Sequence, residues 1–191
     1  MKKPQEIIDQ LSLHDAIAVL KTLADSDAQL AGRIAEIATE QLMEIDPDDV
    51  AAAVLQELDF LEVEDVWDQA GASRDGYRET GEVADEMIGN ALEPYREDLS
   101  RYQKLDMLEE ATCVCMGIIS GLYLFEHESS SEFKNWAADL PVIYAEDTLK
   151  KWYTKDVPQE LVDEMESFIQ SDLPNWPNFQ RLLKNPSAVR R

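Results

Sequence analysis

The fold is decided by one apolar stretch, residues 111–125, with the sequence ATCVCMGIISGLYLF. It carries no charge, while Glu109, Glu110 and Glu126 lie directly beside it. Apolar residues recur every three or four positions, and the opposite side is also apolar, which is typical of a helix surrounded by other helices. A membrane span needs about 20 apolar residues. We therefore predict a buried central helix over 107–126 and no association with a membrane.

Two glycines, Gly117 and Gly121, lie four positions apart within this stretch. Glycine inside a helix costs about 1 kcal/mol relative to alanine. Residues four apart share one face of a helix. We therefore expect a neighbouring helix to approach the backbone closely at these two positions.

The composition favours an all-α fold. The chain has 191 residues, of which 45% are apolar, enough to bury a core. Its 7 glycines and 8 prolines are too few for the turns of an all-β fold, and no segment predicts a strand. Eight to ten amphipathic helices predict a single domain over 1–186, followed by a loose basic tail at 187–191. An irregular α-superhelix and a multi-helix bundle around the central helix both fit this pattern.

Capping residues mark several helix starts. Ser12 is placed to cap one helix, and Asp46 precedes Pro47, which suits the first position of another. Pro94 lies inside the apolar pattern of a long helix. Because proline removes a backbone donor, we expect a kink or a break near this residue.

The cysteines and the N-terminal sequence predict a cytoplasmic protein. Cys113 and Cys115 are the only two cysteines, and within one helix they cannot pair with each other. No apolar run follows the two N-terminal lysines, so no secretory signal is predicted. A reducing compartment is the simplest expectation, with both thiols acting as small apolar side chains.

Four short motifs lie between residues 46 and 152: Asp-Pro-Asp-Asp at 46–49, Val-Trp-Asp-Gln-Ala-Gly at 66–71, Arg-Asp-Gly-Tyr at 74–77 and Leu-Tyr-Leu-Phe-Glu at 122–126. In these motifs the chain resembles uncharacterised α-helical-repeat, α-solenoid-like proteins of prokaryotes. The segment covers just over half of the chain. The resemblance implies a helical scaffold and brings no known activity with it.

No motif predicts a metal site or a catalytic set. His14 and His127 are the only histidines, and neither has an acidic residue three positions before it, as a di-iron bundle requires. His127 is expected to contact carbonyls at a helix end. The Cys-x2-Cys spacing of zinc sites, the glycine-rich phosphate loops and the nucleophile elbow are missing from the sequence. We therefore predict no metal, no cofactor and no catalytic residue, and we favour a protein that is not an enzyme.

One polar loop concentrates binding groups against the acidic background. It combines two arginines and two aromatic residues around an Asp-Gly turn signal. Arginine can form forked pairs with carboxylates, and aromatic rings offer flat contacts. In a competing interpretation the two aromatic rings anchor the loop to the core and Arg74 pairs with an acid of the same chain. The predicted partner-binding residues are Trp67, Asp68, Arg74, Asp75, Tyr77 and Arg78.

The charge narrows the classes of partner. Lys and Arg number 17 against 40 Asp and Glu, a formal net charge of −23. This excess of acids argues against direct nucleic-acid binding. The leading hypothesis is a non-enzymatic helical scaffold that binds another protein, with basic proteins among the candidates. The alternatives are a small metal-dependent hydrolase or another enzyme with carboxylates inside the bundle, and an acidic mimic of nucleic acid that binds a basic partner. The oligomeric state is left open.

Overall fold

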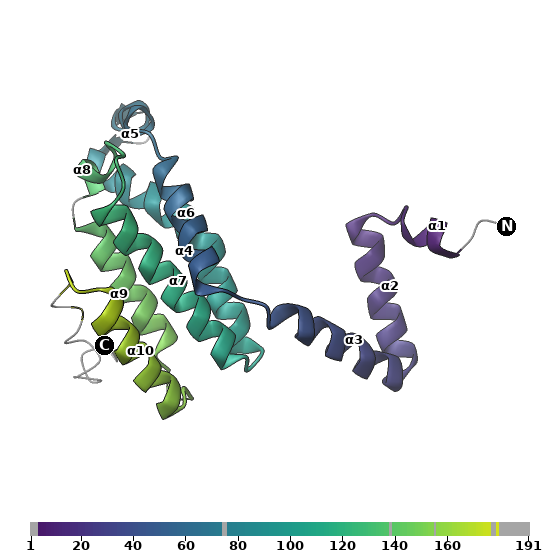
Figure 1. Cartoon of the computed structure of the whole chain (residues 1–191). Helices are drawn as coiled ribbons and strands as arrows, with labels where there is room; N and C mark the ends of the chain where they lie inside the picture. Colours follow the sequence, from purple (N-terminus) through teal and green to yellow (C-terminus); the bar gives the residue numbers. More distant parts are fainter. Residues whose placement is uncertain (1–3, 74–75, 138, 155, 177–178, 180–191) are drawn as a thin grey trace. The chain divides into compact units, whose positions relative to one another are not determined.

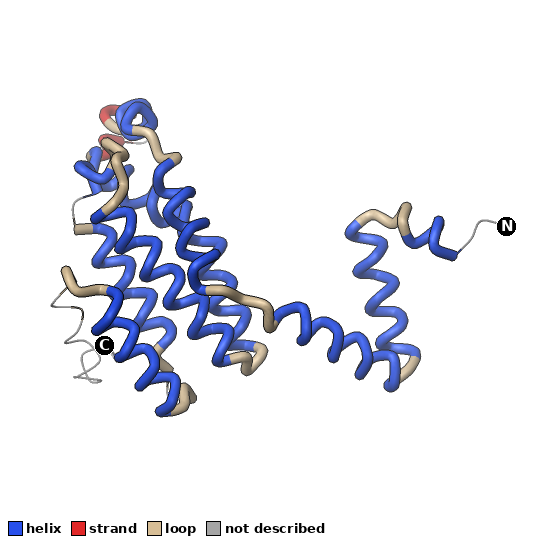
Figure 2. Tube along the Cα trace, viewed as in Figure 1, coloured by secondary structure: helices blue, strands red, loops and turns tan. Residues whose placement is uncertain are grey.

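The computed structural model describes residues 4–73, 76–137, 139–154, 156–176 and 179. The chain forms two compact units, Met1–Glu44 and Ile45–Arg191, where the sequence predicted one domain over 1–186. The predicted tail at 187–191 lies outside the described residues. The described residues form ten helices and one short strand pair, so the all-α class is confirmed (Figures 1 and 2).

The smaller unit contains α1 (Pro4–Ile8), α2 (Leu13–Ser26) and α3 (Ala28–Leu42). Ser12 caps α2 as predicted, because its hydroxyl accepts from the Asp15 backbone N–H at 3.2 Å while the Asp15 carboxylate accepts from Ser12. Asp27 caps α3, because its carboxylate accepts from the backbone N–H groups of Gln29 and Leu30. The two helices pack against each other, yet none of their residues, all of which are described, is buried.

The larger unit is a bundle around α7 (Leu108–His127), more than half of whose residues are buried. The helices α4 (Pro47–Asp59), α6 (Thr80–Lys104), α9 (Leu140–Trp152) and α10 (Gln159–Asp172) all contact α7 (Figure 1). This confirms the predicted central helix and, of the two architectures left open, the multi-helix bundle. Within the described chain, α7 is the one helix long and apolar enough to span a membrane, and 67% of that window is buried in the bundle.

The two glycines of α7 allow the close approach that their spacing predicted. A Cβ added at Gly117 would lie 2.5 Å from Val50 Cβ, and one at Gly121 would lie 2.6 Å from Val54 Cβ. The Cβ at Gly121 would also lie 2.8 Å from the Ala51 carbonyl oxygen. Since these neighbours are backbone and branched side-chain atoms of α4, there is no room for a methyl group at either position.

The expectation of no strand is wrong for the polar loop. After α5 (Val63–Gln69), β1 (Gly71–Ser73) and β2 (Gly76–Arg78) pair antiparallel, with Ala72 opposite Tyr77 (Figure 2). Gly71 enters the pair at φ 98°, a conformation that favours glycine. Three-residue strands are too short to produce the alternating pattern by which strands are detected in a sequence. The remaining short helix, α8, spans Lys134–Ala137.

Of the kink or break expected at Pro94, the break is wrong, because α6 continues from Thr80 to Lys104 through this residue. Pro94 is exposed, and so is Asn90, whose carbonyl would otherwise accept the N–H that proline lacks. Water can satisfy that carbonyl on the open side of the helix. The proline therefore sits where its missing hydrogen bond costs least.

Candidate functional site

The structure brings part of the predicted loop patch together at one end of the larger unit. Trp67 and Asp68 belong to α5, and Tyr77 and Arg78 belong to β2. The other two predicted residues, Arg74 and Asp75, lie outside the described residues. Neither aromatic side chain is anchored in the core, since Trp67 is 60% exposed and Tyr77 is 73% exposed. The competing interpretation is therefore wrong for these two side chains.

Trp67 is held from the side rather than buried. Its ring meets the edge of the Trp136 ring of α8, with the centroids 6.1 Å apart and the planes at 80°. Edge-to-face pairs of this kind add about 0.5–1.5 kcal/mol beyond burial. The pair leaves a flat aromatic surface open to solvent, a type of side chain common in protein interfaces.

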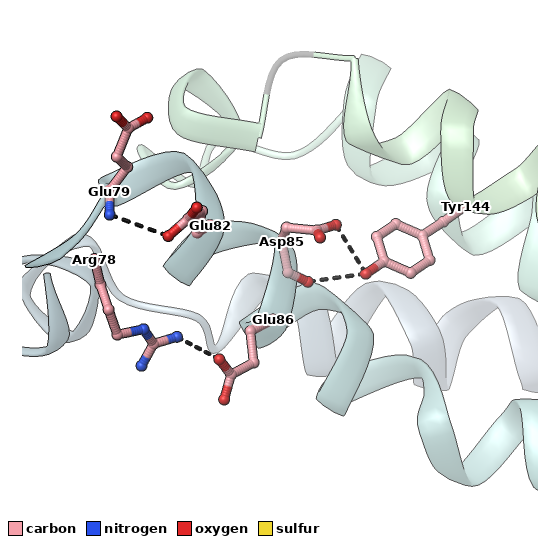
Figure 3. A network of polar contacts seen from close by, with 6 residues as sticks. All are labelled: Arg78, Glu79, Glu82, Asp85, Glu86 and Tyr144. Carbon is pink, nitrogen blue, oxygen red and sulfur yellow. Dashed lines mark hydrogen bonds and ion pairs between the residues drawn. The ribbon is translucent and has the colours of Figure 1, made fainter. Parts of the chain in front are cut away.

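Arg78 is paired within its own chain. Its guanidinium forms an ion pair with the Glu86 carboxylate on the second turn of α6 (Figure 3). Both side chains are exposed enough for the pair to contribute no more than about 1 kcal/mol. The pair nevertheless ties β2 to α6 and occupies the arginine for which a carboxylate of a partner was predicted.

The same helix is linked to α9 by a second polar contact. The Tyr144 hydroxyl donates to the Asp85 backbone carbonyl at 2.9 Å and lies 3.0 Å from its carboxylate (Figure 3). Burial, together with the hydrogen bond and the negative charge of Asp85, raises the pKa of Tyr144 to about 12. The hydroxyl therefore stays protonated and donating throughout the physiological range.

A second surface was not found from the sequence: an open groove of about 670 Å³ between α4, α7 and α10. Apolar side chains form most of its lining, and three carboxylates stand among them. Among the described residues that line it, none is basic. The lining residues are Pro47, Asp48, Ala51, Ala52, Leu55, Met116, Ser120, Tyr123, Leu124, Glu128, Phe168, Asp172 and Leu173.

The groove exists because α7 is apolar on nearly every side while its neighbours cover it unequally. The glycines draw α4 close on one side, and α10 contacts α7 on another. The strip of α7 between them remains accessible. The sequence contained a signal for this groove, because a helix that is apolar on all sides needs neighbours on every side to bury it. Only the packing could show which direction is left open.

The floor of the groove is held in place by contacts at the end of α7. Asn175 donates to the Tyr123 hydroxyl at 2.9 Å, and the His127 ring stacks on the Tyr123 ring with centroids 4.2 Å apart. His127 Nδ1 lies 2.9 Å from the Tyr123 carbonyl oxygen, which confirms the contact expected at this helix end. Trp176, which is buried, donates from its indole to Glu126 at 2.9 Å. Tyr123 is therefore fixed before any partner arrives.

The three carboxylates of the groove, Asp48, Glu128 and Asp172, belong to three different helix ends and are all exposed. A general acid and base pair is tuned by burial within the site, which these exposed carboxylates lack. Their arrangement gives an apolar floor with negative charge around it. Such a surface is complementary to an apolar segment flanked by positive charge.

The thiols and the remaining acids offer little reactive chemistry. Burial raises the pKa of the Cys115 thiol strongly, and burial together with Glu164 and Glu110 raises that of Cys113. Both are therefore protonated and weakly nucleophilic at neutral pH. Within the part of the chain that the structure describes, no group of three or more His, Cys, Asp or Glu side chains is placed to hold a metal ion.

No known family model, curated protein or solved structure matches the chain. The resemblance to helical-repeat proteins and the partner-binding role of the loop patch therefore stay predictions.

Proposed function

We propose that the protein is a non-enzymatic helical scaffold that binds a basic, amphipathic helical segment of another protein in the groove between α4, α7 and α10. The observation that carries the proposal is the groove itself, which has a volume of about 670 Å³, a mostly apolar lining and three exposed carboxylates. An amphipathic helix docks into such a groove through side chains spaced i, i+3, i+4 and i+7.

The walls of the groove suit a helix as occupant. Because the side chains of Ala51 and Ala52 are small, a partner helix can come close to the backbone of α4. Tyr123 and Phe168 provide aromatic surface for the apolar side chains of the partner. Small residues beside fixed aromatic rings form the kind of cavity into which one or two large anchors insert.

The charge of the whole chain supports a basic partner. A net charge of −23 attracts a positively charged segment from a distance and accelerates its association. Close to the groove, Asp48, Glu128 and Asp172 are available to pair with lysine or arginine flanking the apolar stripe. Exposed pairs of this kind contribute specificity and speed of association more than affinity.

The exposure of the three groove carboxylates also bears on the two alternative functions, a hydrolase and a mimic of nucleic acid. A hydrolase would need acids that converge in an apolar pocket, whereas those of the groove stand at its exposed positions. A mimic of nucleic acid would rely on charge alone and has no use for the apolar floor. The scaffold is therefore the function best supported.

The test uses a defined peptide: a fluorescent helical peptide with leucine at i, i+3, i+4 and i+7 and lysine on both flanks. We expect fluorescence anisotropy to show binding to the full chain that weakens several-fold between about 50 and about 300 mM salt. Ala52→Trp, which fills the groove, should weaken binding by about tenfold or more. The matched control is Asn90→Trp, on an exposed position of α6 that does not line the groove.

Two results would contradict the proposal. One is equal affinity for a peptide in which glutamate replaces every flanking lysine, since the carboxylates of the groove should then repel it. The other is an equal loss, or no loss, of binding in Ala52→Trp and Asn90→Trp. Circular dichroism of both variants confirms that the helices are intact before binding is compared.

A further inference from the structure

Within the smaller unit itself, large aliphatic side chains remain exposed after α2 and α3 have packed. In α2 and α3, helices whose residues are all described, no side chain is buried, and six aliphatic residues are 39–47% exposed. We call these six residues the hairpin stripe. They are Ile17, Val19, Leu20, Leu23, Leu30 and Ile37.

The apolar arc of α2 is wider than contact with α3 requires. At 100° per residue, the apolar positions from Val19 to Ile17 span an arc of about 160°. The charged residues Asp15, Lys21 and Asp25 lie outside this arc. A helix that packs against one neighbour needs only a narrow seam, whereas a helix in a four-helix bundle carries a broad face. The breadth in α2 corresponds to a bundle.

The contact between α2 and α3 partly buries mostly small side chains. The half-buried residues of the two helices are Ala16, Ala24, Ala31, Ile34 and Leu42. Their partial burial shows where the hairpin closes on itself. The larger side chains of the hairpin stripe stay exposed. The same side chains would be exposed in one half of a four-helix bundle if its other half were removed.

Size also calls for a partner. The unit spans 44 residues, Met1–Glu44, and its two main helices have 14 and 15 residues. Isolated helices of this length are marginal in water. Folded units of about 40 residues usually depend on a disulfide, a metal or association for their stability. The unit contains no cysteine, and among its described residues no group of three or more His, Asp or Glu side chains is placed to hold a metal ion, which leaves association.

The charges favour a second copy of the chain as that partner. The hairpin stripe is uncharged, so it offers no carboxylate to a basic protein. Lys21 and Arg33 are the only basic residues of α2 and α3, and Arg33 pairs with Glu36 at 3.1 Å. An uncharged apolar face is best covered by another of the same kind. A second copy of the chain supplies such a face. Across a two-fold axis, the hairpin stripe of one chain then contacts the hairpin stripe of the other.

The area available is of the right order. Each helix is about 21 Å long, and packed helices lie 8–10 Å apart, so the hairpin face measures about 400 Å² in flat projection. Interdigitating side chains expose more area than a flat face. This brings each copy toward the roughly 800 Å² that a stable interface buries per partner.

We infer that α2 and α3 form a dimerisation element, in which the hairpins of two chains pair through the hairpin stripe to form a four-helix bundle. The dimer carries two copies of the larger unit. A partner with two binding segments then engages both at once and gains avidity without any new contact.

Sedimentation equilibrium on the full chain tests this inference. We expect a mass of twice 21.7 kDa that falls toward 21.7 kDa on dilution. Leu20→Glu combined with Ile37→Glu buries two carboxylates in the stripe and should abolish the dimer. The matched control, Thr22→Glu with Thr39→Glu, adds the same charge at exposed threonines outside the stripe and should remain dimeric.

Two further measurements keep the result decisive. Leu20→Ala with Ile37→Ala preserves helix propensity and should raise the dissociation constant by about tenfold or more. All four tryptophans lie in Ile45–Arg191, so their fluorescence reports whether the larger unit remains folded in every variant. A wild-type mass of 21.7 kDa, that of one chain, at every concentration would overturn the inference. So would a dimer that survives the glutamate substitutions in the stripe.

Discussion

The helix pairs α4–α7 and α2–α3 arise from similar sequence devices and end in opposite environments. Asp46 caps α4 and Ser12 caps α2, and each pair contains a helical glycine. At Gly121 of α7 a Cβ would lie 2.6 Å from Val54, whereas at Gly32 of α3 no described neighbour lies within 4 Å. The packing therefore requires a glycine at position 121, whereas position 32 could hold a larger residue.

The difference between the two helix pairs shows that helix formation and helix burial have separate causes. Caps and apolar spacing specify that a helix forms, and they act within a few residues. Burial depends on whether other helices arrive to cover the apolar face. The α4–α7 pair is covered by α6, α9 and α10, while the α2–α3 pair keeps its aliphatic side chains exposed. The same substitution should therefore have opposite effects in the two pairs.

The largest effect is expected for Gly121→Ala. The new methyl group meets Val54 Cβ and the Ala51 carbonyl oxygen, neither of which can move without shifting α4. We expect a net loss of about 2 kcal/mol, because overpacking outweighs the gain in helix propensity of about 1 kcal/mol. Thermal unfolding followed by tryptophan fluorescence should show the melting temperature lowered by about 6 °C.

An unchanged or raised melting temperature of Gly121→Ala would break the comparison. It would mean that α4 yields easily, and that the glycines of α7 do not set the distance between the helices. Gly117→Ala, which meets Val50 in the same way, provides an independent repeat at the next site along the same face.

A smaller effect is expected for Tyr144→Phe, which removes the hydrogen bond between α9 and α6 and leaves the α2–α3 pair untouched. Asp85 is exposed and can turn to water, so the loss should be about 1 kcal/mol at neutral pH. Urea unfolding monitored by tryptophan fluorescence measures it. A variant as stable as the wild type would show that the contact adds nothing to the core unit.

The same residue predicts how stability responds to alkali. Its pKa is raised from 10.0 to about 12, so between these values the unfolded chain releases the proton while the folded chain keeps it. The stabilisation is therefore complete below pH 10.0 and is lost as the pH rises toward about 12. Lys151 acts in the opposite sense, since burial and neighbouring cations lower its pKa. The stability difference between wild type and Tyr144→Phe, measured across this range, should isolate the tyrosine by shrinking as pH increases.

The smallest effect, and the one of opposite sign, is expected for Gly32→Ala. The added methyl group meets no described neighbour within 4 Å, and alanine is the better helix former. We expect a gain of about 0.5–1 kcal/mol in the stability of the α2–α3 pair. Far-UV circular dichroism during thermal unfolding should detect it. A loss would indicate that something covers α3 on the side away from the hairpin stripe.

Much of the larger unit was predictable because its signals are local or concentrated in one stretch. Residues 111–125 combine length, apolar surface on all sides and two glycines four apart, and they predicted both a central helix and a close neighbour. The strand pair β1–β2 was not predicted, and at Pro94 the sequence left a kink and a break both open, of which the break did not occur. A strand of three residues has no period to detect, and the cost of a proline depends on which side of the helix meets water.

The candidate sites divide in the same way. The loop patch was proposed from composition, and the structure places Trp67 and Tyr77 in the open, where they are available to a partner. The groove was missed because its lining comes from three helices that are distant in the chain. No spacing rule within one helix connects Ala52, Tyr123 and Phe168. They become one surface only after the helices have packed.

The amino-acid sequence by itself determined the helices, their caps, the buried centre at α7 and the strongly negative charge, because each follows from neighbouring residues or from their sum. The tertiary structure decided which apolar faces are covered and which stay open. That outcome depends on how closely each pair of helices can approach, as the glycines of α7 illustrate. The groove beside α7 and the stripe on α2 and α3 are the surfaces left after the helices packed. Both are therefore properties of the fold that no single segment contains.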